Sequence, residues 1–449
     1  MKIQAIFFSI LALWALVPSS PTFAQMGRRF PSEKKIVPDP VTGIALSFLT
    51  STPGGDRKIY QTHPQWTADG KWLIFESRRA AWQALAVHEE TGDIVQVTEN
   101  GYTGMLCVAQ KSMRLIYLRP VKDAAPESLA PATPVPPAFE VVATDLARVF
   151  ADSKAGSMKP AAVYEHILGT IPAGMATRYE LALDADEEVA YFSLRAETAA
   201  KHLTPGTKLE PSFGPRGMGA GPGGVGSMNL KTGEVKVVVA VPFQVGHIQT
   251  NPWVPREIIF AWETAGKSPQ RTWTVMADGT GLRPLYPEAP YDWVTHEAVV
   301  TRDEVALAIM GHRAPGTNGD WGHSGTREHA TGLGIVNLRT REFYMAGQTK
   351  SGSGLWHVHG SPDGRWAVGD DFDRNIYLID RNTSEMKLLS AGHKSTAADH
   401  PHPTFSRDST RIEIQSAMLS EDNRSMNICV IPVPESWLKR TYVTSGEKK

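Results

Sequence analysis

The sequence predicts an all-β protein, a seven-bladed β-propeller, from three observations. Gly and Pro account for 39 and 32 of the 449 residues, a content typical of chains with many tight turns. Strand–turn–strand units with an Asp-Gly type turn recur, and two of these turns, at Asp363 and Asp408, lie 45 residues apart, the length of a four-stranded blade. No extended segment shows the hydrophobic period of a helix.

Residues 1–24 are predicted to be a signal peptide for export. Lys2 precedes an apolar run from Ile3 to Val17, and Ala24 provides the small residue before the cleavage point. The run is shorter than the roughly 20 residues of a membrane-spanning helix, and an uncleaved anchor is the alternative interpretation. We therefore expect the mature domain, residues 25–449, to be periplasmic or secreted and free of the membrane after cleavage.

The mature chain is predicted to form one domain of TolB- or WD-like blades. The clearest units run over 63–97, 359–389 and 402–431. Less regular units lie between them, at 178–194, 226–240, 252–285 and 297–345. About 400 mature residues at roughly 45–60 per blade give seven blades. Ring closure then buries the faces that one small sheet would leave exposed. The Pro-rich stretch 120–140 and the Gly/Pro-rich stretch 204–226 are predicted to be irregular.

Composition excludes several classes of protein. Lys and Arg number 46 and Asp and Glu number 47, which gives a formal net charge of −1, so no basic excess indicates a nucleic-acid partner. Cys107 and Cys429 are the two cysteines, too few for a disulfide scaffold or a cysteine zinc site. One bridge between them and two buried thiols are both compatible with the sequence.

Histidines are concentrated in the second half of the chain. Ten of the 14 fall between residues 247 and 402. Those beside predicted strand starts should converge on one axial pocket of a propeller; they are His247, His296, His357, His359, His400 and His402. In each His-x-His pair an extended backbone directs both imidazoles to the same side, which suits a metal site. A structural hydrogen-bonding role at blade turns is the alternative for each residue.

The remaining histidines of this region carry no such pattern. His312, His323 and His329 are assigned to loops, with His393 as a weaker candidate for the site. The string Ser351-Gly-Ser-Gly lacks the strand–elbow–helix context of a serine hydrolase. A pocket of histidines, a metal and arginines instead suits proton abstraction beside a carboxylate, because a cation stabilises the charge that develops while a neutral imidazole takes the proton.

An ordered set of short motifs carries a resemblance to a known family. The motifs are Asp39-Pro-Val-Thr-Gly43, Tyr60 to Gly70, Leu230 to Glu234, Gly246-His247, Arg271-Thr-Trp273, Thr295-His296-Glu297, His357 before Asp363-Gly364, and His400-Pro-His402-Pro-Thr-Phe405. With these motifs the chain resembles the oligogalacturonate lyases, seven-bladed propeller enzymes of pectin breakdown. The resemblance is spread over most of the mature chain.

The resemblance implies a reaction and a set of roles. His247 looks like the catalytic base, and His296, His400 and His402 look like ligands of a divalent ion, most simply Mn²⁺ with Ca²⁺ as the alternative. Arg271 and His357 lie at positions that resemble substrate-facing ones. Apart from the resemblance, Arg57, Tyr60 and His63 of the first blade are expected to line the pocket, with surface and packing roles as the alternative, and His359 is counted with the substrate-binding residues. The implied reaction removes the C5 proton of a uronosyl unit and expels the O4 glycoside, which leaves a 4,5-unsaturated sugar. The implied partner is a short uronate-containing oligosaccharide.

The sequence departs from the family pattern at two positions. Ala397 stands where the family carries a glutamine ligand, so that Asp399, His393 or water would fill the coordination sphere. No arginine occurs in 221–228, where the family carries a catalytic one; Arg216 is the nearest, with Arg195 as a second candidate. A non-catalytic periplasmic propeller with TolB-type repeats, which binds a protein or carbohydrate partner, is therefore the alternative function.

Overall fold

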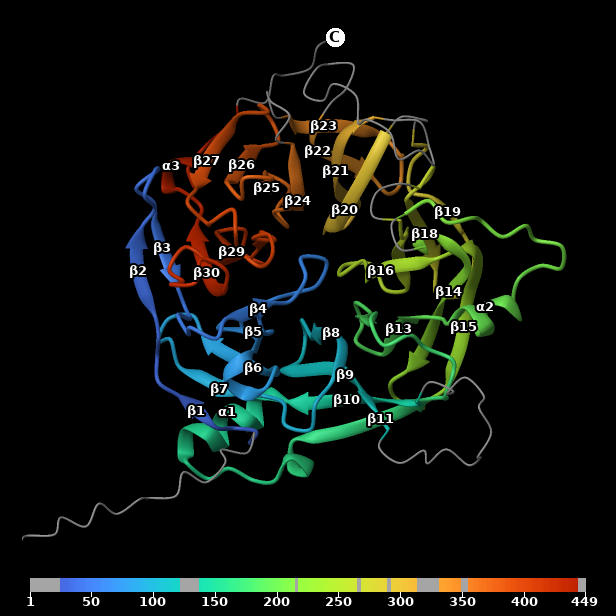
Figure 1. The fold of residues 1–449 in the computed structure, drawn as a ribbon, viewed down its shortest axis with the longest axis horizontal. Helices are drawn as coiled ribbons and strands as arrows, with labels where there is room; N and C mark the ends of the chain where they lie inside the picture. The colour runs from blue at the N-terminus through green and yellow to red at the C-terminus, as the bar shows by residue number, and fades with distance from the viewer. Residues whose placement is uncertain are drawn as a thin grey trace, which may run out of the picture.

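The chain folds into a ring of antiparallel sheets around a central axis (Figure 1). The computed structural model describes residues 25–121, 137–214, 217–264, 268–288, 292–312, 331–348 and 354–442. These residues form seven sheets, which confirms the predicted seven-bladed propeller. The predicted signal peptide, Arg216, His323, His329 and the string from Ser351 to Ser353 lie outside the described residues. Within these ranges no helix is long and apolar enough to span a membrane.

Each blade has its first strand next to the axis and later strands farther out. The first four blades are β4 (Asp56–Lys58), β5 (Trp72–Ser77), β6 (Gln83–His88) and β7 (Ile94–Gln96); β8 (Thr103–Val108), β9 (Arg114–Pro120), β10 (Phe139–Asp145) and β11 (Glu165–Ile171); β12 (Ala182–Leu183), β13 (Val189–Ser193), β14 (Ala220–Asn229) and β15 (Val235–Phe243); and β16 (Val245–Thr250), β17 (Glu257–Trp262), β18 (Thr272–Met276) and β19 (Arg283–Pro284).

The last three blades follow the same scheme. They are β20 (Asp292–Thr301), β21 (Glu304–His312), β22 (Thr331–Asn337) and β23 (Phe343–Gln348); β24 (Leu355–Gly360), β25 (Trp366–Asp371), β26 (Ile376–Asp380) and β27 (Met386–Ser390); and β28 (Thr404–Phe405), β29 (Arg411–Ser416) and β30 (Asn427–Pro432), completed by two N-terminal strands. Apolar side chains of adjacent blades meet face to face. Trp366 and Val368 of β25, for example, share a buried cluster with Ile412 and Ile414 of β29.

The two ends of the chain close the ring together. Strand β3 (Ala45–Phe48) pairs with β30, with Phe48 opposite Cys429, and β2 (Lys35–Pro38) adds the outer edge. Strand β1 (Arg29–Phe30) pairs with β7 of the neighbouring blade. Because the last blade combines strands from both ends, its pairing converts an open row of sheets into a closed ring. In Figure 1 the blue β2 and β3 lie beside the red β30.

Two expectations about local structure need correction. A ten-residue helix, α1 (Leu146–Ala155), follows β10; Asp145 caps it through Arg148 N–H, and Gly156 ends it at φ +68°. Two shorter helices, α2 (Ala196–Ala200) and α3 (Glu435–Leu438), lie at the periphery. Residues 220–226 begin β14 and are not irregular, because glycine there permits close packing. A Cβ at Gly221 would lie 1.7 Å from the Pro242 carbonyl oxygen.

The two cysteines are free and buried. Cys107 lies on β8 and Cys429 on β30, and the strands belong to different sheets. The interpretation of two separate thiols is therefore the one the structure supports.

Substitution of Phe48 tests the ring closure. Phe48 has no exposed surface and packs in the cluster that joins the last two blades. Phe48→Ala should lower the free energy of unfolding by about 3–5 kcal/mol, because it leaves a cavity at the closing sheet. Chemical denaturation measures the change. The control Val41→Ala, at a side chain that is 65% exposed, should change it by less than about 0.5 kcal/mol. Equal effects of the two substitutions would refute this account of closure.

Candidate functional site

Bulges in the inner strands turn the key side chains toward the axis. The register of β16 shifts between Gly246 and Gln249, and that of β20 shifts between Thr295 and Ala298. Each bulge therefore contains a histidine in the left-handed region, His247 at φ +51° and His296 at φ +53°. This conformation is unfavourable for a residue with a Cβ. Such residues persist where surrounding contacts fix them, often at functional sites.

Four histidines from three successive blades meet at the axis. His402, also in the left-handed region at φ +53°, stacks on His357 with 3.8 Å between ring centroids. His357 lies 4.1 Å from the ring of His296 and 5.2 Å from that of His400. Each of the three predicted metal ligands thus lies close to the ring of His357. The ligand atoms that lie within 4.8 Å of one another are those of His357, Asp370 and His400; among the described residues, His296 and His402 fall outside this set.

A buried carboxylate joins this group. Asp370 on β25 has no exposed surface, and its Oδ2 lies 3.1 Å from His357 Nδ1 and 3.6 Å from His400 Nδ1. The backbone N–H groups of His357 and His402 also donate to this side chain. Burial would raise the pKa of Asp370, but His357 and His400 hold it far below its ordinary value. The side chain is therefore ionised.

The environment of the histidines suits a divalent cation. Burial lowers the pKa of His296 well below its usual value and that of His357 to about 3, so both imidazoles are unprotonated at neutral pH, as metal ligation requires. Two buried nitrogens, His400 Nδ1 and His402 Nε2, make no well-formed hydrogen bond to a described residue, and their nearest carboxylate oxygens are Asp370 Oδ2 at 3.6 Å and Asp399 Oδ1 at 3.2 Å. A bound cation would satisfy nitrogens left in this arrangement. The residues present therefore fit a divalent ion.

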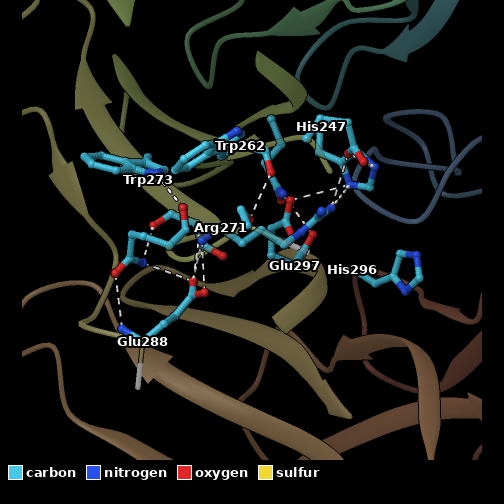
Figure 2. A network of polar contacts seen from close by, with 12 residues as sticks. His247, Trp262, Arg271, Trp273, Glu288, His296 and Glu297 are labelled. Carbon is cyan, nitrogen blue, oxygen red and sulfur yellow. Dashed lines mark hydrogen bonds and ion pairs between the residues drawn. The ribbon is translucent and has the colours of Figure 1, made fainter. Parts of the chain in front are cut away.

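His247 lies beside this group in a network of opposite charges (Figure 2). Its Nε2 is 3.2 Å from Glu263 Oε2, and its Nδ1 is 3.4 Å from Glu297 Oε1. Arg271 donates from Nε to Glu297 Oε2 over 3.0 Å, and its Nη2 lies 3.4 Å from His247 Nδ1. Figure 2 shows the guanidinium between Glu297 and His247.

These contacts set the protonation of His247. Burial alone would lower its pKa, but the carboxylates of Glu263 and Glu297 outweigh burial and raise it. Burial would raise the pKa of Glu297, but Arg271 and His247 lower it to about 2. The network therefore holds an ionised carboxylate next to an imidazole that gains a proton more readily than a free histidine does.

Arg271 occupies a different environment from the one expected of a substrate-facing residue. Its side chain is 1% exposed and does not line the cavity beside His247. Glu288 accepts hydrogen bonds from its backbone N–H, while Glu263 and Glu297 pair with the guanidinium. Arg271 therefore lies behind His247, where it positions the two carboxylates.

A cavity of about 670 Å³ opens beside His247 and His402. Tyr60 forms part of its wall and makes edge contacts with both histidines, at 5.4 and 5.1 Å between ring centroids. Other residues of its wall bear charge; they are Arg57, Lys58, Glu76, Glu180 and Asp399. Glu180 accepts from the backbone N–H groups of His247 and Ile248 and so stabilises the bulge.

His63 and His359 line a second cavity, of about 460 Å³. His63 Nε2 contacts the Leu181 carbonyl over 2.8 Å, and His359 Nδ1 contacts the Gly360 carbonyl over 2.8 Å. Thr250, at the far end of β16 from His247, belongs to the same cavity. His63 and His359 therefore line a different cavity from His247, although Thr62 lines both cavities and His63 lies within electrostatic range of His247.

The remaining candidates are placed as follows. Arg216 lies outside the described residues. Arg195 pairs with Glu197 over 3.4 Å and lines neither cavity. Both ring nitrogens of His393 are within hydrogen-bond distance of serine hydroxyls, at 2.7 and 2.8 Å, so that this buried histidine has a structural role. His312 ends β21.

Sequence reasoning missed the carboxylates that surround the histidines. Glu263 follows β17, Asp370 lies on β25, and Glu180 precedes β12, so each comes from an element other than the one that carries its histidine. Only Glu297, adjacent to His296 in the sequence, had a local signal.

Comparison with known proteins places this geometry in a structural context. No protein-family model matches the sequence, and no curated protein matches it. The structure is similar to that of an oligogalacturonate lyase in complex with manganese, with 18% identity, 92% of this chain and 100% of that chain covered, and a TM-score of 0.67. An oligogalacturonate lyase from Vibrio parahaemolyticus is similar at 17% identity, the same coverage and a TM-score of 0.65. The resemblance seen in the sequence is thus confirmed at the level of the fold, which is that of a lyase-like seven-bladed propeller.

Proposed function

We propose that the protein is a metal-dependent lyase that cleaves uronate-containing oligosaccharides by β-elimination, and that it acts after export to the periplasm or outside the cell. The observation that carries the proposal is the convergence of His247, His296, His357, His400 and His402 at one end of the axial channel. The fold shared with an oligogalacturonate lyase in complex with manganese supports the substrate class and the ion.

The reaction needs a base, a cation and groups that hold the sugar acid. His247 would take the C5 proton through Nε2, once the substrate displaces the Glu263 carboxylate from that nitrogen. His296, His357, His400 and His402 would hold the divalent ion, which supplies Lewis-acid stabilisation of the charge that develops on the uronate carboxylate. Arg57, which lines the cavity and has a side chain that is 57% exposed, would bind another carboxylate of the oligosaccharide.

The alternative is a non-catalytic propeller that binds a protein or sugar. The observation that favours it is the placement of Arg271, which lies behind His247 and pairs with Glu263 and Glu297. A binding module has no need for a cluster of buried histidines around a buried carboxylate. The two functions differ in whether uronate oligomers are turned over, and the ultraviolet absorbance of the unsaturated product measures this directly.

Replacement of His247 tests the role of the base. His247→Asn is the suitable variant, because Asn tolerates the left-handed backbone of this position better than most residues. With Mn²⁺ and oligogalacturonate, we expect turnover to fall at least about 100-fold, the usual contribution of a general base, while metal content stays unchanged. The matched control His202→Asn, at an exposed histidine, should retain full turnover. Equal turnover by both variants would remove His247 from the mechanism.

The pH dependence tests the charge network. The carboxylate of Glu263 raises the pKa of His247, and only the unprotonated imidazole accepts a proton. Glu263→Gln should therefore lower that pKa and move the ascending limb of kcat/KM to lower pH. An NMR titration of the His247 imidazole should show the same shift without substrate. Glu234→Gln, on an exposed hairpin, is the control. An unchanged titration in Glu263→Gln would contradict the assigned network.

A further inference from the structure

The metal site lacks an oxygen ligand at the position where the resemblance implies one. Ala397 is 7% exposed and packs with Ala417 and Met426 in a small apolar cluster. Its side chain is a methyl group among other apolar groups, so this segment supplies no oxygen from residue 397. If the cluster of histidines holds a cation, any oxygen ligand that the protein supplies comes from another residue, and water is the alternative.

Two other candidates can be compared by their surroundings. His393 is excluded because Ser390 and Ser416 occupy its two ring nitrogens. Asp399 lies 3.2 Å from His402 Nε2, but its side chain is 51% exposed and lies at the wall of the cavity. Asp399 therefore contacts the ring of one histidine, His402, from the solvent side, and its Oδ1 accepts from the backbone N–H of His400 over 2.8 Å.

Asp370 is placed among the histidines. Potential ligand atoms of His357, Asp370 and His400 all lie within 4.8 Å of one another, a separation that one ion can bridge. Asp370 lies on β25, opposite the bulge of β24. Its Oδ1 accepts from the backbone N–H of His357 over 2.7 Å, and its Oδ2 accepts from the backbone N–H of His402 over 3.3 Å. Each carboxylate oxygen has more than one lone pair, so these bonds leave capacity for a cation.

We infer that Asp370 is a direct ligand of the divalent cation, together with His357 and His400, and that it takes the place of the missing amide ligand. The inference deepens the proposed function, because it names ligands of the ion on which that function rests. A carboxylate replaces a neutral amide, so the net charge of the ion and this ligand falls from +2 to +1. Carboxylate oxygen with imidazole favours Mn²⁺ over softer ions that prefer sulfur ligands.

Calorimetric titration of the purified protein with MnCl₂ tests the assignment. Asp370→Asn should weaken Mn²⁺ binding by more than about 100-fold, beyond the roughly 10–100-fold that removal of a group hydrogen-bonded to a ligand costs. Asp399→Asn should weaken it less, and His393→Gln should leave it unchanged. Direct ligation by Asp370 would be overturned if Asp370→Asn weakened Mn²⁺ binding by less than about 100-fold. It would also be overturned if Asp399→Asn weakened Mn²⁺ binding more than Asp370→Asn does.

A second measurement needs no substitution of Asp370 and covers the case in which that variant does not fold. Protein made with ¹³C-carboxyl aspartate and loaded with Mn²⁺ should show ¹³C coupling to the ion in electron–nuclear double resonance. The coupling should persist in labelled Asp399→Asn. Its absence from the wild-type protein, or its loss in Asp399→Asn, would overturn the inference. If the coupling is present but no uronate oligomer is turned over, Asp370 remains a metal ligand and the proposed lyase function is refuted. Failure of the inference and failure of the proposed function are therefore distinguishable.

Discussion

The site depends on bulged inner strands whose backbone is held in the left-handed region. In a regular strand, successive side chains alternate between the two faces of the sheet. The extra residue of each bulge instead directs His247 and His296 toward the axis. Each left-handed residue costs about 1–2 kcal/mol, and side-chain carboxylates offset this cost. Glu180 accepts from the backbone N–H of left-handed His247, and Asp370 accepts from that of left-handed His402.

Charge divides the histidines into two functional groups. His247 faces Glu263 and Glu297, which raise its pKa. His296 and His357 lie among other imidazoles, where burial lowers their pKa. One group is therefore suited to exchange a proton, and the other is suited to present lone pairs to a cation. Arg271 keeps the two groups distinct, because its pairs with Glu263 and Glu297 hold these carboxylates on the side of His247.

The sequence predicted the fold and the axial histidines because both produce local signals. Asp-Gly turns at blade spacing indicated the propeller, and histidines beside strand starts indicated convergence. Asp370 gave no such signal, because its contact with His357 depends on the register between β24 and β25. His63 and His359 were assigned to the same pocket as His247, but both line the second cavity, and the sequence does not reveal this because the cavity that a side chain enters depends on how the blades pack. The helix α1 was missed because its apolar side is short, with only Leu146, Val149 and Ser153 buried.

The central claim is that the axial histidines share one cation. Anomalous diffraction from a crystal of the wild-type protein soaked in MnCl₂, measured on both sides of the manganese edge, tests it most directly. The account predicts one strong peak among His296, His357, His400 and His402, at about 2 Å from the ligating nitrogens. A peak at another place on the molecule, or none at full soaking, would contradict it.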